Sequence, residues 1–452
     1  MNKTSESSSG SQRDTAGTPE EQATSKQARK ALLGSFIGTS LEWYDFFLFG
    51  TTAAIVFAPL FFGGDDPALQ TIQSFLAFGV GFIGRPLGAV VFGHFGDRLG
   101  RKGVLMVTIV LMGIASTLIG LLPTFETAGI VAPILLAILR FIQGLSAGGE
   151  WGGAMLMAVE SAPKHKRGLY GAIVQLGSPV GTLLSSGIVA ATVALSGDEF
   201  LNWGWRIPYL LSIVLVVLGV WVRSQLEETN DYREEAAKPK EKGIPLVQIL
   251  TRSPGRLLVG VTSYLFGTAG FFLLTAFMID YATRILELEA TVILVAISWG
   301  ALAQIIAMYI AGKFADRFSP SAVVIIGHLF AVIVALPIFW LVDTKSPGLI
   351  IFAMVLGLGL ASVPYASVGT LLTQLFPTKI RYSAMALSAN IAGVVAGFAP
   401  ALAAWILTTA NGSSVGPAIM LLSIAAISLV GSIFARRIIA ADKRKLQEAE
   451  QA

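Results

Sequence analysis

Long apolar stretches alternate with short polar segments along almost the whole chain. A helix needs roughly 20 mostly apolar residues to cross a bilayer, and twelve stretches qualify. The first six lie approximately at 31–57, 70–96, 103–122, 130–159, 169–195 and 205–222. The second six lie approximately at 257–281, 290–314, 321–342, 348–374, 382–409 and 415–437. The pattern therefore predicts an all-α integral membrane protein with twelve transmembrane helices.

Polar segments divide the chain into two six-helix halves. Residues 1–30 are rich in Ser, Thr, Gln and Gly, a composition that predicts a disordered tail. We expect a first bundle over 31–222, a linker over 223–256, a second bundle over 257–437 and a second tail over 438–452.

A short charged signature occurs twice, about half a chain apart. The first copy is Gly93-His-Phe-Gly-Asp97-Arg98-Leu-Gly100-Arg101-Lys, and the second is Gly312-Lys-Phe-Ala-Asp316-Arg317-Phe. A second echo relates the segment from Glu160 to Arg167 to the segment from Gln374 to Arg381. Two echoes at equivalent loops indicate a duplicated bundle, which is the architecture of secondary transporters.

Charge is scarce and unevenly placed. Charged residues make up 13% of the chain, whereas soluble domains contain roughly 25%. The net charge of +4 comes from Lys and Arg concentrated in both tails and in alternate loops. This asymmetry predicts that both termini are cytoplasmic, and it points to a lipid bilayer and not to nucleic acid as the partner.

Several strings resemble a known family. The first signature resembles the loop 2–3 motif of the major facilitator superfamily, and Arg140-Phe-Ile-Gln-Gly144 resembles its fourth-helix arginine motif. Strings around Glu42-Trp43-Tyr44-Asp45 and around Arg85-Pro86 resemble its metabolite:proton symporter branch. The resemblance implies the major facilitator fold, with two six-helix pseudo-repeats, and a location in the plasma membrane of a bacterium.

Ionisable residues inside the spans are the first candidates for chemistry. A charge in the hydrocarbon costs at least ~2.5–3.5 kcal/mol on insertion scales, so it is retained mostly for function or pairing. The first half contains five such residues, namely Glu42, Asp45, Arg85, Arg140 and Glu150. We read the second half as offering only neutral polar groups.

We expect Asp45 and Arg140 to form the proton-coupling pair, because a rise of ~1.5 Å per residue places them at similar depth. Arginine favours the charged form of a nearby carboxylate, and loss of that partner favours protonation. The alternative is a static ion pair. Glu42 is an alternative proton carrier or a packing residue. Glu150 either passes the proton inward or pairs with Arg85.

Candidates for substrate contact combine charge, amides and aromatic rings. Arg140, Gln143 and Glu150 share one side of a helix, and that side is expected to line a cavity. The alternative for the aromatic residues is a lipid-facing or packing role, and for the amides it is a bond between helices. The full set is Tyr44, Arg85, Arg140, Gln143, Trp151, Gln304 and Asn390.

The repeated signatures are expected to form a cytoplasmic gate. Salt bridges among them would hold the inner side shut and break as the halves rock, and exposed pairs worth about 0–1 kcal/mol suit such a latch. The alternative is positive charge that serves topology alone. The candidates are Gly93, Asp97, Arg98, Gly100, Arg101, Glu160, Arg167, Asp316, Arg317 and Arg381.

Together these features predict a proton-coupled symporter that imports a small carboxylate-bearing metabolite, such as a shikimate-like hydroxy acid, by alternating access. The alternatives are a proton-driven exporter of drugs or metabolites and a symporter for zwitterions such as proline or betaine. An enzyme is not expected, because the chain has no cysteine and only three histidines, without metal-ligand spacing. We expect no cofactor or metal, with the proton as coupling ion, and a monomer.

Overall fold

The computed structural model describes residues 19–99, 101–148, 155, 158–159, 162–224, 249, 251, 253–377 and 380–451. Every regular element in this part of the chain is helical. Nine helices there are long and apolar enough to cross a membrane, and three shorter apolar helices are Met106–Gly120, Val131–Ala147 and Arg206–Trp221. The predicted all-α fold with twelve membrane helices is confirmed.

The first half begins with one long helix that contains a π-helical turn, formed by α1 (Pro19–Thr52), η1 (Ala53–Phe57) and α2 (Ala58–Phe61). The remaining elements are α3 (Pro67–Leu99), α4 (Arg101–Gly120), α5 (Phe125–Ala128), α6 (Val131–Ala147), η2 (Lys164–Lys166), α8 (Arg167–Gln175), α9 (Gly177–Ser196), η3 (Gly197–Glu199), η4 (Phe200–Gly204) and α10 (Arg206–Ser224).

The second half begins with a helix interrupted by three π-helical turns, formed by α13 (Pro254–Leu265), η5 (Phe266–Gly270), η6 (Leu273–Phe277), α14 (Met278–Asp280) and η7 (Tyr281–Ile285). It continues with α15 (Ala290–Arg317), α16 (Pro320–Asp343), α17 (Pro347–Met354), η8 (Val355–Leu360), α18 (Val363–Leu375), α19 (Arg381–Thr409) and α20 (Val415–Gln451). Wide turns of this kind occur often at functional sites.

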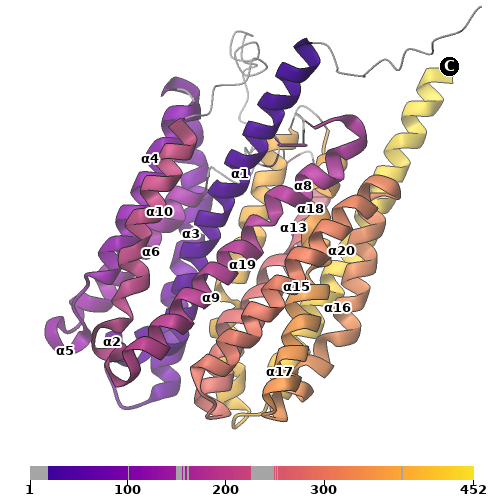
Figure 1. The fold of residues 1–452 in the computed structure, drawn as a ribbon. Helices are drawn as coiled ribbons and strands as arrows, with labels where there is room; N and C mark the ends of the chain where they lie inside the picture. The colour runs from indigo at the N-terminus through magenta and orange to yellow at the C-terminus, as the bar shows by residue number, and fades with distance from the viewer. Residues whose placement is uncertain are drawn as a thin grey trace, which may run out of the picture.

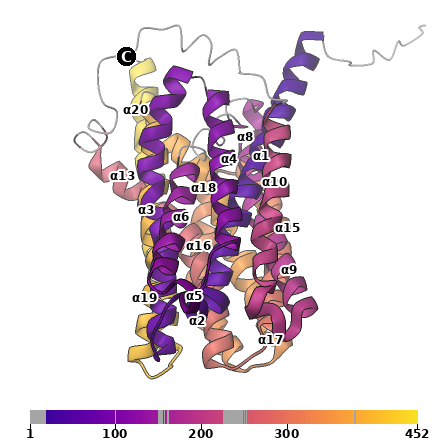
Figure 2. The same ribbon diagram turned by 90° about the vertical axis from the view of Figure 1, so that its left-hand side faces the viewer.

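The helices run along one common direction and form two neighbouring bundles (Figures 1 and 2). The start of α1 and the end of α20 lie at the same end of the molecule, which we call the terminal end (Figure 1). Across the boundary between the halves, α3 packs against α19, and α9 packs against α15.

The first helix starts earlier than the sequence predicted. Residues 19–30 were expected to belong to a disordered tail, but α1 begins at Pro19 and continues without a break into the first span. Proline favours the first helical position, because its fixed φ suits the helix and its missing N–H is not needed there. The expected disorder of residues 1–18 lies outside the described residues.

Glycines bring α3 and α6 into backbone contact. A Cβ added at Gly144 would lie 1.7 Å from the carbonyl oxygen of Gly81, and one at Gly148 would lie 1.9 Å from that of Arg85. Gly144 and Gly148 are four residues apart, the spacing by which membrane helices approach closely. This crossing also places Arg85, on α3, near Arg140, on α6.

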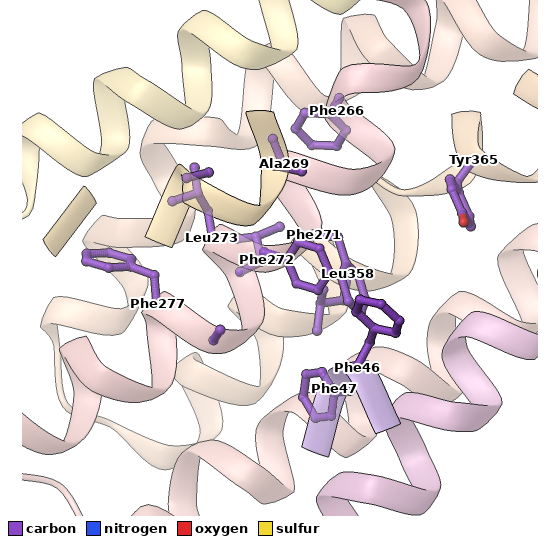
Figure 3. Packing of buried hydrophobic residues seen from close by; sticks show 14 of the residues in the cluster. Phe46, Phe47, Phe266, Ala269, Phe271, Phe272, Leu273, Phe277, Leu358 and Tyr365 are labelled. Atoms are coloured by element: carbon purple, nitrogen blue, oxygen red, sulfur yellow. The ribbon is translucent and has the colours of Figure 1, made fainter. Parts of the chain in front are cut away.

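Aromatic rings join the two halves in the middle of the bundle. The ring of Trp43 lies 5.3 Å from that of Phe271 and 6.1 Å from that of Tyr365. The ring of Phe78 lies 5.0 Å from that of Phe272. Figure 3 shows Phe271 and Phe272 side by side within this packed cluster. The halves are therefore closed on each other at this level.

Candidate functional site

Arg140 is fully buried and surrounded by aromatic rings. Its Cζ lies 4.4 Å from the ring centroids of Phe46 and Phe49, so cation–π contact replaces part of its lost hydration. Its Nε donates to the carbonyl of Phe78 at 3.3 Å, and its Nη1 donates to Oε1 of Gln143 at 3.1 Å. Its Nη2 has no hydrogen-bond partner among the described residues. A buried charged donor in this condition suits an additional acceptor, such as a carboxylate.

Asp45 is linked to Arg140 through neutral groups. Its Oδ1 accepts a hydrogen bond from Ser212 at 3.2 Å, and the hydroxyl of Ser116, which donates to the carbonyl of Met112 at 3.0 Å, lies near the carboxylate. The same Ser116 oxygen accepts a bond of 2.7 Å from Nε2 of Gln143, which itself accepts from Arg140. A polar chain therefore runs from α1 through α4 to α6.

The direct ion pair between Asp45 and Arg140 is absent in this conformation, although both side chains are described. The two helices still touch, because Arg140 of α6 lies against the rings of Phe46 and Phe49 on α1. Helix α6 packs mainly on α3 and α4, and the side chain of Gln143 fills the space beside the guanidinium. The two groups still interact electrostatically, without a direct contact.

A second charged pair connects α1 to α3. Glu42 Oε1 and Arg85 Nη2 lie 2.9 Å apart, and the two side chains are only 4% and 14% exposed. The Arg85 Cζ also lies 5.1 Å from the ring of Phe46, the same residue that contacts Arg140. Phe46 therefore separates the two arginines, and the structure pairs Arg85 with Glu42. The alternative partner, Glu150, lies outside the described residues.

The second half places two tyrosines near this pair. The hydroxyls of Tyr264 and Tyr365 are 3.4 Å apart. Both interact electrostatically with Glu42 and Arg85. The side chain of Gln175, from the first half, donates to the carbonyl of Tyr365 at 3.4 Å. Polar groups of both halves therefore meet next to the ring of Trp43.

The other substrate-contact candidates lie in different surroundings. Tyr44 donates its hydroxyl to the carbonyl of Pro208 at 2.9 Å inside the first half, which favours its packing alternative. Its neighbour Trp43 faces the second half and was not selected from the sequence. Gln304 is buried, and its Oε1 finds no partner within the described ranges, whereas Asn390 is buried on α19. Trp151 lies outside the described residues.

The second half also contains a buried acidic residue that the sequence pattern did not single out. Asp280 is 1% exposed and accepts two hydrogen bonds from Arg284, at 2.8 and 2.9 Å. Both residues line a pocket of about 410 Å³ between the halves, at the end opposite the termini, together with Thr71 of α3. The statement that the second half holds only neutral groups is therefore wrong. An aspartate four residues before an arginine was the available signal.

Asp316 connects the halves at the terminal end. Its Oδ1 accepts from the backbone N–H of Gly168 at 2.6 Å, and its Oδ2 accepts from that of Leu169 at 3.1 Å. These N–H groups open α8, so the carboxylate of one half occupies the positive end of a helix in the other. The gate candidates Arg167 and Arg381 line a pocket of about 540 Å³ around this contact.

The other gate candidates contribute less to this geometry. The guanidinium of Arg317 lies over the ring of Phe318, 5.7 Å from its centroid. Gly93, Asp97 and Arg98 belong to the end of α3, and Arg101 begins α4, but their side chains lie outside the described residues. Gly100 and Glu160 lie outside the described residues altogether.

Comparison with known proteins identifies the family to which the chain belongs. The chain matches the model of the Major Facilitator Superfamily over residues 35–400 and 263–452. It is 42% identical to the shikimate transporter of Escherichia coli (strain K12) over 419 residues, which cover 90% of this chain and 94% of that protein. It is 34% identical to the proline/betaine transporter of the same strain over 419 residues, with coverages of 90% and 83%.

Solved structures show the same fold at lower sequence identity. A D-xylose–proton symporter superposes with a TM-score of 0.71 at 18% identity, covering 90% of this chain and 97% of that one. The partially occluded inward open conformation of the xylose transporter XylE from E. coli gives 0.69 at 16% identity, with coverages of 91% and 98%. At such identities the likeness concerns the fold alone.

Proposed function

Since the chain belongs to the Major Facilitator Superfamily, a family of membrane transporters and not of enzymes, we propose that it is a proton-coupled symporter for a small carboxylate-bearing metabolite. A shikimate-like hydroxy acid is the leading substrate class, supported by the relative at 42% identity. The coupling ion is the proton, and no further cofactor takes part. Transport proceeds by alternating access between the two halves.

The observation that carries this proposal is the buried series of polar side chains that connects Asp45 to Arg140. A fully buried guanidinium whose Nη2 has no partner in the described part of the chain offers a donor that fits a carboxylate. A proton on Asp45 removes the negative charge that otherwise competes for this guanidinium. Protonation and solute binding therefore favour each other, and together they neutralise the site before the halves move.

Asp316 supplies the closing contact in this cycle. While its carboxylate caps α8 of the other half, the terminal end is shut. Release of these two hydrogen bonds lets the terminal end open. We propose that this end faces the cytoplasm of a bacterium, as the distribution of Lys and Arg suggests. The protein then works as a monomer in the plasma membrane.

A zwitterion such as proline or betaine is the second candidate solute. The ring of Trp43 lies close to Phe271 and Tyr365, and such aromatic groups suit a cationic ammonium. The nearby Glu42–Arg85 pair offers both signs of charge. The relative at 34% identity supports this alternative. A proton-driven exporter of drugs or metabolites is the third candidate.

Proteoliposomes with an imposed pH difference test the proposal. Shikimate, 2-oxoglutarate, citrate, proline and betaine are offered separately, with the outside acidic and then with the gradient collapsed by a protonophore. A symporter accumulates its solute only while the gradient lasts. Extrusion of preloaded solute under the same gradient would identify an antiporter, and accumulation of betaine but not of the acids would favour the zwitterion candidate.

A further inference from the structure

A groove lined by three arginines lies at the terminal end, between the start of α16 and the end of α20. Its volume is about 620 Å³, and none of the described residues that line it is acidic. The lining residues are Ile325, Ile433, Arg436, Arg437, Ala440, Ala441 and Arg444. The groove is separate from the polar side chains that connect Asp45 to Arg140, and the transport cycle proposed above does not use it.

The arginines share one face of α20. Ile433, Arg437, Ala440 and Arg444 follow the spacing of three and four residues that places side chains on one helix face. At ~1.5 Å per residue, Arg437 and Arg444 lie roughly 10 Å apart along the helix axis. The headgroup layer of a bilayer is roughly 5–7 Å thick on each side. The basic face therefore extends through a layer of this thickness.

Neighbouring acid does not neutralise these charges. Asp442 is the nearest acidic residue along α20, but its carboxylate accepts hydrogen bonds from Nη1 and Nη2 of Arg256, at 2.7 and 2.9 Å. Within the described part of the chain, Arg436, Arg437 and Arg444 make no ion pair, and all three are exposed. A cluster of uncompensated guanidinium groups suits a phosphate, which they bind in bidentate fashion.

Exposed apolar side chains continue from the groove along the outside of the bundle. Phe434 on α20 is 48% exposed, and Ile326 and Leu329 on α16 are 67% and 48% exposed. In a membrane protein such a surface contacts acyl chains. A molecule that fits both features has an anionic head and an apolar tail.

We propose that this groove binds the phosphate of an anionic phospholipid. The guanidinium groups of Arg436, Arg437 and Arg444 hold the headgroup, the small side chains of Ala440 and Ala441 leave room for it, and the acyl chains lie along the apolar surface of α16 and α20. The bound lipid then supports the contact between these two helices. Basic pockets between membrane helices bind acidic headgroups on the same physical grounds.

Native mass spectrometry of the full chain, released from nanodiscs of equal phosphatidylglycerol and phosphatidylcholine, tests the proposal. The wild type should retain phosphatidylglycerol preferentially. In the triple variant Arg436→Gln/Arg437→Gln/Arg444→Gln this preference should fall by roughly a hundred-fold, since each basic residue near an anionic surface contributes about five-fold. The charge-retaining triple Lys variant and Lys445→Gln, which lies outside the groove, should keep most of it.

Two further measurements keep the test decisive. Retention by the wild type should decrease as salt is raised, because exposed charges are screened, so the test survives if the triple variant fails to fold. Excess inorganic phosphate should not displace the lipid. Equal retention of both lipids by the wild type, or displacement by inorganic phosphate, would overturn the proposal. Failure of the proposed transport activity would leave this result unaffected.

Discussion

The carboxylate of Asp316, in the second half of the chain, accepts a hydrogen bond of 2.6 Å from the backbone N–H of Gly168, in the first half. A second oxygen of the same carboxylate binds the next N–H. The two halves are thus joined at the terminal end by a side chain acting on a helix start. The repeated signature acts here through a helix cap and not through an exposed ion pair.

Replacing Asp316 by Asn should weaken closure of the terminal end. Hydrogen bonds to a charged group contribute about 1.5–3 kcal/mol each, and the neutral amide retains only part of this. The chain has no cysteine, so a single Thr370→Cys in the pocket near the contact reports opening. Thiol labelling should become at least about ten-fold faster, the effect of losing ~1.4 kcal/mol of closure.

Two controls accompany this measurement. In Gly168→Ala, the added Cβ would lie 2.7 Å from Oδ1 of Asp316, so labelling should accelerate without any change of charge. Asp198→Asn, an exposed acid on η3, should leave the rate unchanged. If Asp316→Asn labels at the wild-type rate, the carboxylate does not hold this end shut.

Replacing Asp45 by Asn should abolish accumulation of solute against its gradient while leaving exchange of labelled for unlabelled solute measurable. The amide occupies the same space but cannot take up and release the coupling proton. Uptake under an inward proton gradient should fall at least about ten-fold, equivalent to ~1.4 kcal/mol. Ser212→Ala removes one hydrogen bond and keeps the carboxylate, so coupling should persist. Unchanged accumulation in Asp45→Asn would exclude this residue as the proton carrier.

Breaking the pair of Glu42 and Arg85 on one side only should destabilise the protein strongly. Removing one partner of a buried ion pair costs about 3–5 kcal/mol, because the other charge stays buried without compensation. We expect Glu42→Gln and Arg85→Gln each to lower the thermal unfolding midpoint in detergent, and the double variant to recover part of the loss. Additive losses in the double variant would show that the two side chains are not energetically coupled.

Adding a methyl group at Gly144 should disrupt the crossing of α3 and α6. The new Cβ would lie 1.7 Å from a backbone oxygen of the facing helix, so the helices must separate. Gly144→Ala should therefore reduce the yield of folded protein and the solute uptake together. Gly187→Ala is the matched control, since nothing lies within 4 Å of its added Cβ. This control should be neutral or slightly stabilising, by up to about 1 kcal/mol.

The positions of the membrane helices could be predicted because hydropathy is a local property of the chain. The partners of the buried charges could not, because they depend on how helices cross. The sequence suggested Glu150 as a partner of Arg85, and the structure pairs Arg85 with Glu42. It placed Asp45 beside Arg140, but Ser116 and Gln143 lie between them. Asp280 was missed because it lies near the end of an apolar stretch, where a charged residue does not by itself indicate burial in the membrane.

The sequence by itself determined a twelve-helix membrane protein in two related halves, since the length of an apolar stretch and the composition of a charged loop are properties of consecutive residues. Only the tertiary structure decided which charges meet. Glycines at the crossing of α3 and α6 let these helices approach closely, and Arg140, surrounded by aromatic rings, keeps one guanidinium nitrogen without a partner among the described residues. Such contacts join residues far apart in the chain, so their energies depend on packing that no local pattern contains.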